Sequence, residues 1–425
     1  MLIRFVHIFL GVYFSCSVAI AGQTQLSSAE ASHKALENNP NLAMINARFL
    51  ALSKISVQVG ALPEPTFRFN FANLPLDSFA FDQTPMTQIQ IGITQALPFP
   101  GKLALKSETA SILATASQEN WQDAKRKLIQ QVKHHWWQLF YLDHALLIIE
   151  KNFDVLNQLI EVTETKYSVG QGLQHDILLA QVESSRLQDK KLQTLAKRRT
   201  TQAKLNNLMG VSQNNKITLP INIDVNLPTI NNSADYHTQA KLNRPDVKRI
   251  KLLADAAKKR IELAKRDHYP NFQLGALYGW RENQTGLASL QLSMNIPWDT
   301  TNRQKPAIDQ RNNEWMQQKY AVNVVENQIK EDIEIAVSNY SQANQQANLY
   351  INTIIPQTEQ AVQAMLAGYQ VNKVDFLNLM QAQITLLNYE TLYWKSLSQA
   401  KQSLAALDAA IGATLIGTTL GVKHE

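Results

Sequence analysis

An internal repeat is the feature that most constrains how this chain can fold. Residues 166–183 read KYSVGQGLQHDILLAQVE, and residues 368–385 read GYQVNKVDFLNLMQAQIT. With Tyr167 set over Tyr369, a valine, an alanine and a glutamine coincide and no gap is needed. Such self-similarity indicates a chain built from two copies of one structural unit. We therefore expect two similar halves.

Each copy contains a predicted turn between two long helices. Gly170 can adopt the left-handed conformation that ends a helix at little cost, and Asn372 is among the next best residues for that position. Polar helical runs precede and follow both turns. Each half is therefore predicted to hold an antiparallel helical hairpin, with its tip at 170–173 or at 372–375.

The N-terminus has the pattern of a secretion signal. Arg4 supplies the positive charge, an apolar stretch follows over 5–14, and Ala19 and Ala21 frame a cleavage site. We predict a signal peptide over 1–21 and a mature chain that starts with the next residue. Cys16 is the only cysteine, and lipidation of its thiol is the alternative to removal. After removal, the mature chain has no thiol for disulfides or metal binding.

Charge and hydropathy further limit the kinds of protein that this chain can be. The net charge is +6, and basic runs at 125–127, 197–199 and 258–260 lie inside helical patterns. No recognised nucleic-acid module accompanies these runs, so we interpret them as solvated helix faces and expect no nucleic-acid partner. Beyond the signal we expect no segment with the roughly 18 apolar residues of a membrane-spanning helix. An exported chain of this kind is either soluble or a membrane barrel.

Alternating side chains predict two pairs of strands, one pair in each half. The predicted strands cover 66–72 and 88–97 in the first half, and 272–280 and 290–296 in the second. A soluble sheet alternates in the same way, but strands of about 10 residues with aromatic residues near their ends favour a membrane barrel. The predicted lipid-facing positions are Phe67, Phe69, Phe71, Ile89, Ile91, Ile93, Leu274, Leu290 and Leu292.

The number of strands is a further constraint. The smallest barrels that span a membrane have about eight strands, so four cannot close one. Open sheet edges are not tolerated in lipid. If these strands lie in a membrane, other subunits must complete the barrel.

The rest of the chain is predicted to be helical. A helix over 29–59 is interrupted at 38–40, and a proline-free helix over 103–169 would span about 100 Å. Its leucines and isoleucines recur at alternate spacings of three and four, which is typical of a coiled-coil seam. The matching helix of the second half begins near 304 and is expected to kink or break at Pro356.

These patterns divide the chain into successive parts. We predict the signal peptide at 1–21, a first repeat at 22–209, a linker at 210–232, a second repeat at 233–412 and a short irregular tail at 413–425.

The sequence carries no recognised motif for enzymatic chemistry. The sequence has no phosphate-binding loop, dinucleotide fingerprint, HExxH or GxSxG motif. His134, His135 and His144 lie among aromatic residues, and nothing in the pattern makes them converge as metal ligands. We expect these histidines to pack within a helix, and we expect no catalytic, cofactor or metal site.

The order of helix, strand pair, long helix, tip and return helix, repeated twice, resembles the TolC family of outer-membrane efflux proteins. The resemblance implies a mainly α chain with a membrane β-barrel: a homotrimer with a 12-stranded barrel and an α-helical periplasmic tunnel. It implies a passive efflux duct in the outer membrane of a Gram-negative bacterium, surrounded by outer-membrane lipid. The implied partners are a periplasmic adaptor protein and an inner-membrane pump.

The resemblance also assigns candidate residues. It implies that the adaptor docks at the helical tips, at Gly170, Gly172, Leu173, Asn372, Val374 and Asp375. Aspartates narrow the periplasmic entrance in well-known relatives, and the matching positions here are Asn378 and Gln381. Asp176 and Asp375 lie nearby and are candidates to replace them.

A finer resemblance points to a branch that works with heavy-metal cation exporters. It rests on four segments around the first strand pair: LPEP at 62–65, NLPLDSF at 73–79, FDQTPMTQ at 81–88 and LPFPGK at 97–102. Two other functions remain open at this point. One is a duct for type I protein secretion, and the other is a periplasmic coiled-coil scaffold whose strands form a soluble cap.

Overall fold

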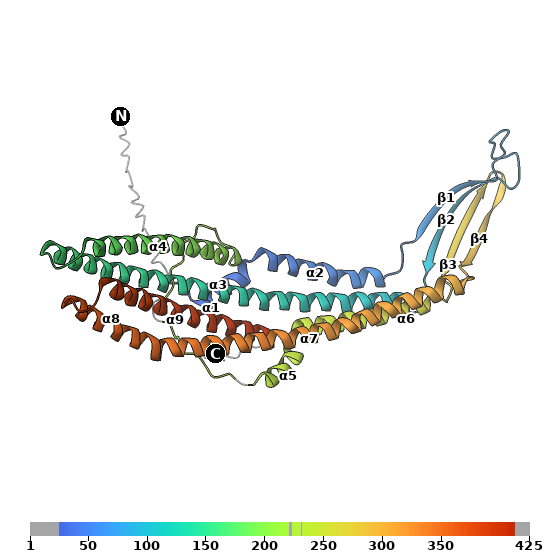
Figure 1. The fold of residues 1–425 in the computed structure, drawn as a ribbon. Coiled ribbons are helices and arrows are strands. Elements are labelled where there is room, and N and C mark those ends of the chain that lie inside the picture. Colours follow the sequence, from blue (N-terminus) through green and yellow to red (C-terminus); the bar gives the residue numbers. More distant parts are fainter. Residues whose placement is uncertain (1–24, 221–222, 231, 413–425) are drawn as a thin grey trace, which may run out of the picture.

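The protein is a long helical body with a small sheet at one end (Figure 1). The computed structural model describes residues 25–220, 223–230 and 232–412. The predicted signal peptide and tail therefore lie outside the described residues. The elements are α1 Ser28–Asn38, α2 Pro40–Gly60, β1 Thr66–Ala72, β2 Gln88–Leu97, α3 Lys102–Ser168, α4 Gln174–Leu208, α5 Ser233–Asn243, α6 Pro245–Arg266, β3 Phe272–Arg281, β4 Gln284–Met294, α7 Lys305–Leu349, α8 Ile355–Gln370 and α9 Phe376–Ile411.

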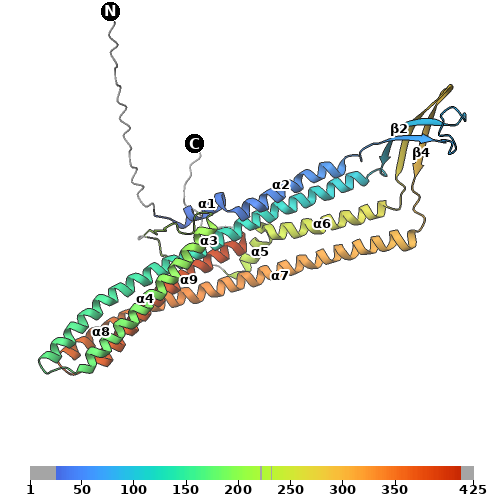
Figure 2. The same ribbon diagram turned by 90° about the horizontal axis from the view of Figure 1, so that it is seen from above.

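The two halves follow the same order, and their hairpin tips lie side by side at the end opposite the sheet (Figures 1 and 2). In the first half α3 turns back into α4, and in the second α8 turns back into α9. The helix α3 has 67 residues and is the longest element. It is the main helix of the first half and runs unbroken, as the absence of proline predicted.

Local signals explain where the helices begin and break. Ser27 and Glu30 form a reciprocal capping box at α1, with Ser27 N donating to Glu30 Oε2 at 2.9 Å. Asn39 caps α2, whose first residue is Pro40, so the interruption predicted at 38–40 is confirmed. The break predicted at Pro356 is also confirmed, because a π-helical turn, Tyr350–Ile354, comes directly before α8.

Helix α2 differs from the expectation drawn from hydropathy. With 21 residues it is long and apolar enough, by length and composition alone, to cross a membrane. It is the one such helix among the described residues, and it runs beside α3 (Figure 2).

The main core lies where α1, α3, α4 and the predicted linker meet. Trp136 is buried there, and its indole Nε1 donates to the carbonyl of Leu26 at 2.9 Å. Ile217 and Leu219 of the linker belong to the same cluster, and Leu26 N donates to Thr218 O at 2.8 Å. The 210–232 segment is thus packed against the helices over its described part, although it forms no helix or strand there.

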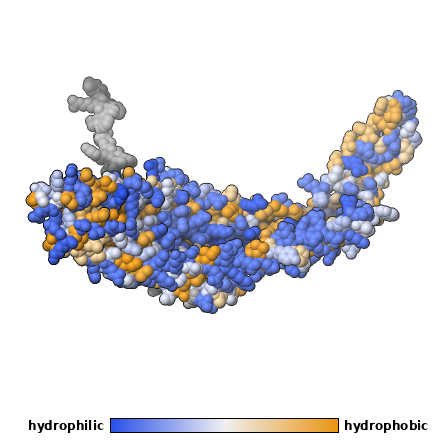
Figure 3. All heavy atoms as spheres, viewed as in Figure 1, coloured by the Kyte–Doolittle hydropathy of each residue, from blue (hydrophilic) through white to orange (hydrophobic). Residues whose placement is uncertain are grey.

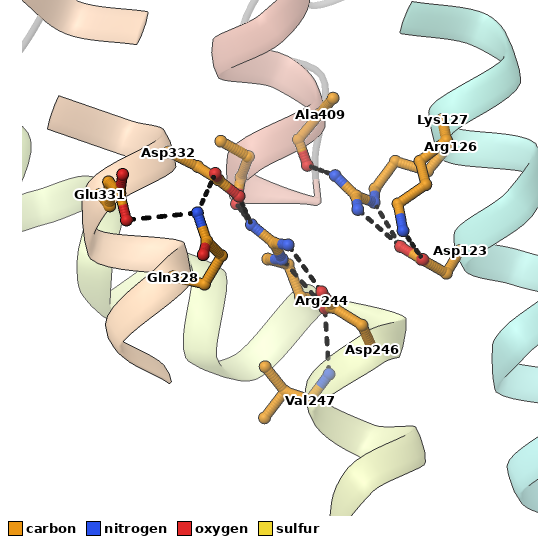
Figure 4. A network of polar contacts seen from close by, with 11 residues as sticks. Asp123, Arg126, Lys127, Arg244, Asp246, Val247, Gln328, Glu331, Asp332 and Ala409 are labelled. Carbon is orange, nitrogen blue, oxygen red and sulfur yellow. Dashed lines mark hydrogen bonds and ion pairs between the residues drawn. The ribbon is translucent and has the colours of Figure 1, made fainter. Parts of the chain in front are cut away.

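Two arginines hold the C-terminal end of α9 (Figure 4). Arg244 donates to the carbonyl of Ala410 at 3.2 Å and pairs with Asp246 at 2.6 Å and Asp332 at 3.2 Å. Arg126 of α3 donates to the carbonyl of Ala409. These side chains donate to carbonyls in the last turn of α9, and they join α3, α6, α7 and α9 at one point.

The four strands form one antiparallel sheet in the order β1-β2-β3-β4. The first three match the predicted ranges to within one residue. The fourth begins at Gln284, six residues before the predicted start, and ends at Met294. Its first residues lack alternation, so pairing with β3 after the turn at Asn283, which has φ of 53°, places them in the sheet.

Candidate functional site

The first candidate surface is the apolar face of the sheet. The register sets Phe69 opposite Ile91, Ile91 opposite Tyr278, and Ala276 opposite Leu290, so the predicted positions share one face. All nine predicted side chains are exposed except Ile89, which is half-buried. Figure 3 shows this apolar surface over the strands, in contrast to the polar body. An exposed apolar face of this extent marks an interaction surface.

The sheet also leaves two edges. β1 has only β2 as a neighbour, and β4 has only β3. An unpaired edge exposes backbone donors and acceptors that can bind another chain. The sheet of the single chain therefore has an exposed apolar face and two edges whose backbone groups are not paired with another strand.

The second candidate surface is the pair of helical tips, and their backbones are alike. Gly170 has φ of 74° and Asn372 has φ of 58°, as the turn signals predicted. Gln171 N donates to Lys166 O, and Lys373 N donates to Gly368 O, each at 2.8 Å. This bond closes the same helix-ending motif in both copies and gives the repeat a structural basis.

Two tip positions are constrained by packing. A Cβ on Gly172 would lie 2.9 Å from the backbone nitrogen of Tyr167. Val374 covers Gly368, where a Cβ would lie 2.5 Å from Val374 Cγ2. Substitutions at Gly172 or Val374 would therefore disturb the turn itself.

Other tip side chains point freely outward. Leu173 is exposed, as are Val169 and Val371, which sequence reasoning did not single out. Asp375 is exposed and precedes α9. The tips thus present apolar side chains beside turn backbone, which suits contact with a partner helix.

Lys166 connects the two tips. Its ammonium group lies 2.6 Å from Asn372 Oδ1, donates to the carbonyl of Tyr369, and lies 4.2 Å from the centre of the Tyr369 ring. The buried Tyr369 hydroxyl has no hydrogen-bond partner among the described residues. Burial and, to a smaller extent, the Asp176 carboxylate raise the pKa of Tyr369.

The three predicted entrance residues differ in exposure. Asp176 is only 8% exposed and lies 3.1 Å from His175 Nε2. Asn378 and Gln381 are exposed on α9. A ring of such groups would require further subunits.

The histidines of α3 lie in an aromatic environment. His144 stacks on Trp394 with ring centres 3.8 Å apart, and its Nδ1 lies 3.0 Å from the carbonyl of Phe140. Burial is the main cause that lowers the pKa of His135, to about 4. In the part of the chain that the structure describes, no three His, Cys, Asp or Glu side chains are grouped to hold a metal ion.

Comparison with known proteins agrees with this geometry. The family described as "Outer membrane efflux protein" matches residues 31–211 and 237–413. The chain belongs to the outer membrane efflux protein family. Its two matched segments correspond to the two structural halves, each with one strand pair and one hairpin.

Solved structures share the fold at low sequence identity. The outer membrane protein VceC from Vibrio cholerae aligns with a TM-score of 0.77 and 16% identity, covering 91% of this chain and 96% of that one. The MtrE outer membrane channel of Neisseria gonorrhoeae aligns at 0.75 and 17%, covering 91% and 89%. CusC aligns at 0.76 and 16%, covering 92% and 93%. The TolC-type fold predicted from the sequence is thereby confirmed.

A curated relative matches over a shorter range. An uncharacterized protein of Haemophilus influenzae is 22% identical over 198 residues, which are 47% of this chain and 44% of that relative's length. Family membership supports the interpretation that the chain is a transport duct and not an enzyme.

Proposed function

We propose that this protein is the outer-membrane exit duct of a tripartite efflux system. In this proposal three copies share a 12-stranded barrel, and their helices form a tunnel across the periplasm. The observation that carries it is the sheet, which has an exposed apolar face, two unpaired edges and too few strands to close alone. A soluble cap on a scaffold would gain nothing from such a face.

Exposed apolar side chains along the helical body support assembly with further copies. Val57 of α2, Leu192 of α4 and Val324 of α7 are all exposed in the single chain. In the assembled tunnel these faces would pack against neighbouring subunits.

The partners in the proposal are a periplasmic adaptor and an inner-membrane pump. The adaptor would dock at the tips formed around Gly170, Leu173, Asn372 and Asp375. An open groove of about 650 Å³, lined by residues of α3, α8 and α9, lies behind the tips and has room for part of a partner helix.

The cargo in the proposal is a small toxic solute, and heavy-metal cations are the class suggested by the segments around the first strand pair. The duct itself would be passive. Selection and energy would come from the pump.

Tip variants test the docking. We expect Leu173→Glu and Val371→Glu to abolish efflux while trimer abundance stays unchanged, because both side chains are exposed and neither backbone has φ above zero. Gly172→Glu is a control for turn damage, since its Cβ would meet the Tyr167 backbone. Each variant is expressed in a strain whose own gene for this protein has been deleted. Metal and drug susceptibility is measured together with the abundance of trimers in the membranes.

The outcomes separate docking from folding. If the Leu173 and Val371 variants lose resistance only in proportion to lost trimers, the tips are structural and the docking proposal is wrong. Suppressor mutations in the adaptor gene would support direct contact.

A further inference from the structure

The boundary between sheet and helices is a firmly bonded region. The Oδ1 atom of Asn271 accepts from Phe99 N at 3.1 Å and from Lys102 Nζ at 3.0 Å. Asn271 N donates in turn to Asn295 Oδ1 at 2.8 Å. The segments that follow β2 and β4 and precede β3 are thereby tied together. Side chains displayed at this boundary have fixed positions.

The apolar face of the sheet continues past the end of β4. Leu290, Leu292, Met294, Ile296 and Trp298 are 88%, 70%, 56%, 67% and 91% exposed. Leu290, Leu292 and Met294 alternate along β4 and so share one face of the sheet. Ile296 and Trp298 follow at the same spacing in the segment after the strand. The row ends in a tryptophan, which is enriched where hydrocarbon meets headgroups.

A second aromatic group lies at the same boundary. Phe99 and Tyr269 stack with ring centres 4.5 Å apart and an angle of 12° between planes. Phe99 follows β2 and Tyr269 precedes β3. Aromatic residues thus border the helical side of the apolar face at three of its four strands.

Four cations are close to these aromatic residues in the sequence. Lys265 and Arg266 end α6, Arg303 lies in the π-helical turn Thr300–Gln304, and Lys305 is the first residue of α7; all four are exposed. None of the four takes part in an ion pair within the described ranges. We call these cations together with Trp298 the boundary girdle.

The nearby carboxylates offset this charge only in part. Asp267 lies 3.0 Å from Lys102 Nζ. Asp299 accepts from the backbone N of Asn302 at 3.0 Å and from its side-chain Nδ2 at 3.1 Å. Asp267 is thus paired with a cation outside the girdle, whereas Asp299 keeps its negative charge because its partners are uncharged, and the exposed Asp309 follows Lys305 by one helical turn. The four cations outnumber these two carboxylates, so the girdle keeps an excess of positive charge.

The guanidinium of Arg266 is held in place. One of its nitrogens lies 3.4 Å from the carbonyl of Pro100. A Cβ on Gly101 would lie 3.6 Å from the guanidinium carbon, so the group rests against that glycine. Its remaining N–H groups are available, and the planar fork suits phosphate oxygens.

We propose that the boundary girdle binds the phosphate groups of anionic phospholipids in the periplasmic leaflet, with Trp298 seated at the level of the headgroups. The proposal rests on the membrane position given in the proposed function and adds the lipid class and the residues. A row of apolar side chains leading directly to unpaired cations matches an acyl chain that ends in an anionic headgroup. Free phosphate has no apolar part that could contact the apolar row.

The test compares lipid binding by purified trimers. Wild-type protein, Lys265→Gln/Arg266→Gln and Arg303→Gln/Lys305→Gln are mixed with phosphatidylglycerol or phosphatidylcholine in detergent, and bound lipid is counted by native mass spectrometry. Lys197→Gln/Lys204→Gln on α4 is the matched control, because both lysines are exposed, without a recorded ion pair and far from the sheet. Inorganic phosphate is added in a parallel series as competitor.

The expected result is selective. Wild type and the α4 control should prefer phosphatidylglycerol, and each cation removed from the girdle should weaken that lipid about fivefold. Binding of phosphatidylcholine should change little. Trp298→Ala should weaken both lipids, since it removes the apolar anchor and leaves the charge.

Two results on lipid affinity would overturn the inference. One is equal affinity of wild type for the two lipids, and the other is unchanged phosphatidylglycerol binding in both girdle variants. Displacement of the lipid by millimolar phosphate alone would identify a simple anion site and also contradict it. All variants should remain membrane-bound trimers; if wild type itself is not one, the proposed function fails, which is a separate outcome.

Discussion

At the residue scale, Lys166 is the clearest case of a side chain whose importance depends on the fold. It is on the first tip, yet its ammonium group contacts the carbonyl and ring of Tyr369 and lies 2.6 Å from Asn372 Oδ1 on the second. Lys166 thus links the two hairpins at their tips.

Removing this link should loosen the second tip. A hydrogen bond to a charged group contributes about 1.5–3 kcal/mol, so Lys166→Gln should speed local opening by about tenfold or more. Hydrogen exchange of the amides at 368–376 measures this opening. Lys373→Gln is the control, because Lys373 is exposed on the same tip without a recorded ion pair. Equal exchange in both variants would contradict the linking role.

His135 gives a prediction about pH. Burial, followed by the charges of His134 and Lys204, lowers its pKa from 6.5 to about 4. Between these values the unfolded chain binds a proton that the folded chain does not, so stability should fall as pH drops from about 6.5 toward 4. Above that range His135 should have no effect.

The check is thermal unfolding from pH 8 to about 4.5. His135→Gln should flatten the acid side of the profile, whereas His33→Gln, a change on the exposed surface of α1, should leave it as in wild type. An unchanged acid slope in the His135 variant would contradict the assignment.

At the element scale, the two faces of the sheet are expected to tolerate charged side chains differently. Leu292 is on the apolar face, and its neighbour Gln291 is on the other. If the apolar face contacts lipid, Leu292→Arg should cost about 2–4 kcal/mol near the bilayer midplane. Gln291→Arg should be tolerated better. Denaturant titration of both variants in lipid vesicles decides, and equal cost on the two faces would argue against the membrane assignment.

The sequence predicts the elements well because their signals are local. Alternation over a few residues placed the strands, and Gly170 and Asn372 placed the turns. The early start of β4 escaped prediction because residues 284–289 show no alternation and enter the sheet only by pairing with β3. The sequence predicts a kink or break at Pro356 but not the π-helical turn before it, since the proline does not specify how the helix adapts.

The contacts between elements were not predictable in this way. Arg126 donates to the carbonyl of Ala409, which is 283 residues away in the sequence, and Lys166 contacts Asn372 on the second tip. Each of these cations looks like one more charge on a polar helix in the sequence. The constraint on Gly172 likewise depends on the approach of Tyr167, which only the turn creates.

At the scale of the whole molecule, the proposed function treats the single chain as one part of a larger assembly. It has a sheet with two unpaired edges at one end, paired tips at the other and exposed apolar side chains between them. Each of these features is explained if the chain is one third of a closed channel. The chain belongs to the outer membrane efflux protein family and shares the fold of VceC and MtrE.

The most direct test of this account is the mass of the protein extracted from outer membranes in mild detergent. The account predicts a stable trimer, with three times the mass of the mature chain, recovered from the outer-membrane fraction. Recovery of a stable monomer from that fraction, or of a soluble protein from the periplasm, would contradict the shared barrel and with it the proposed channel.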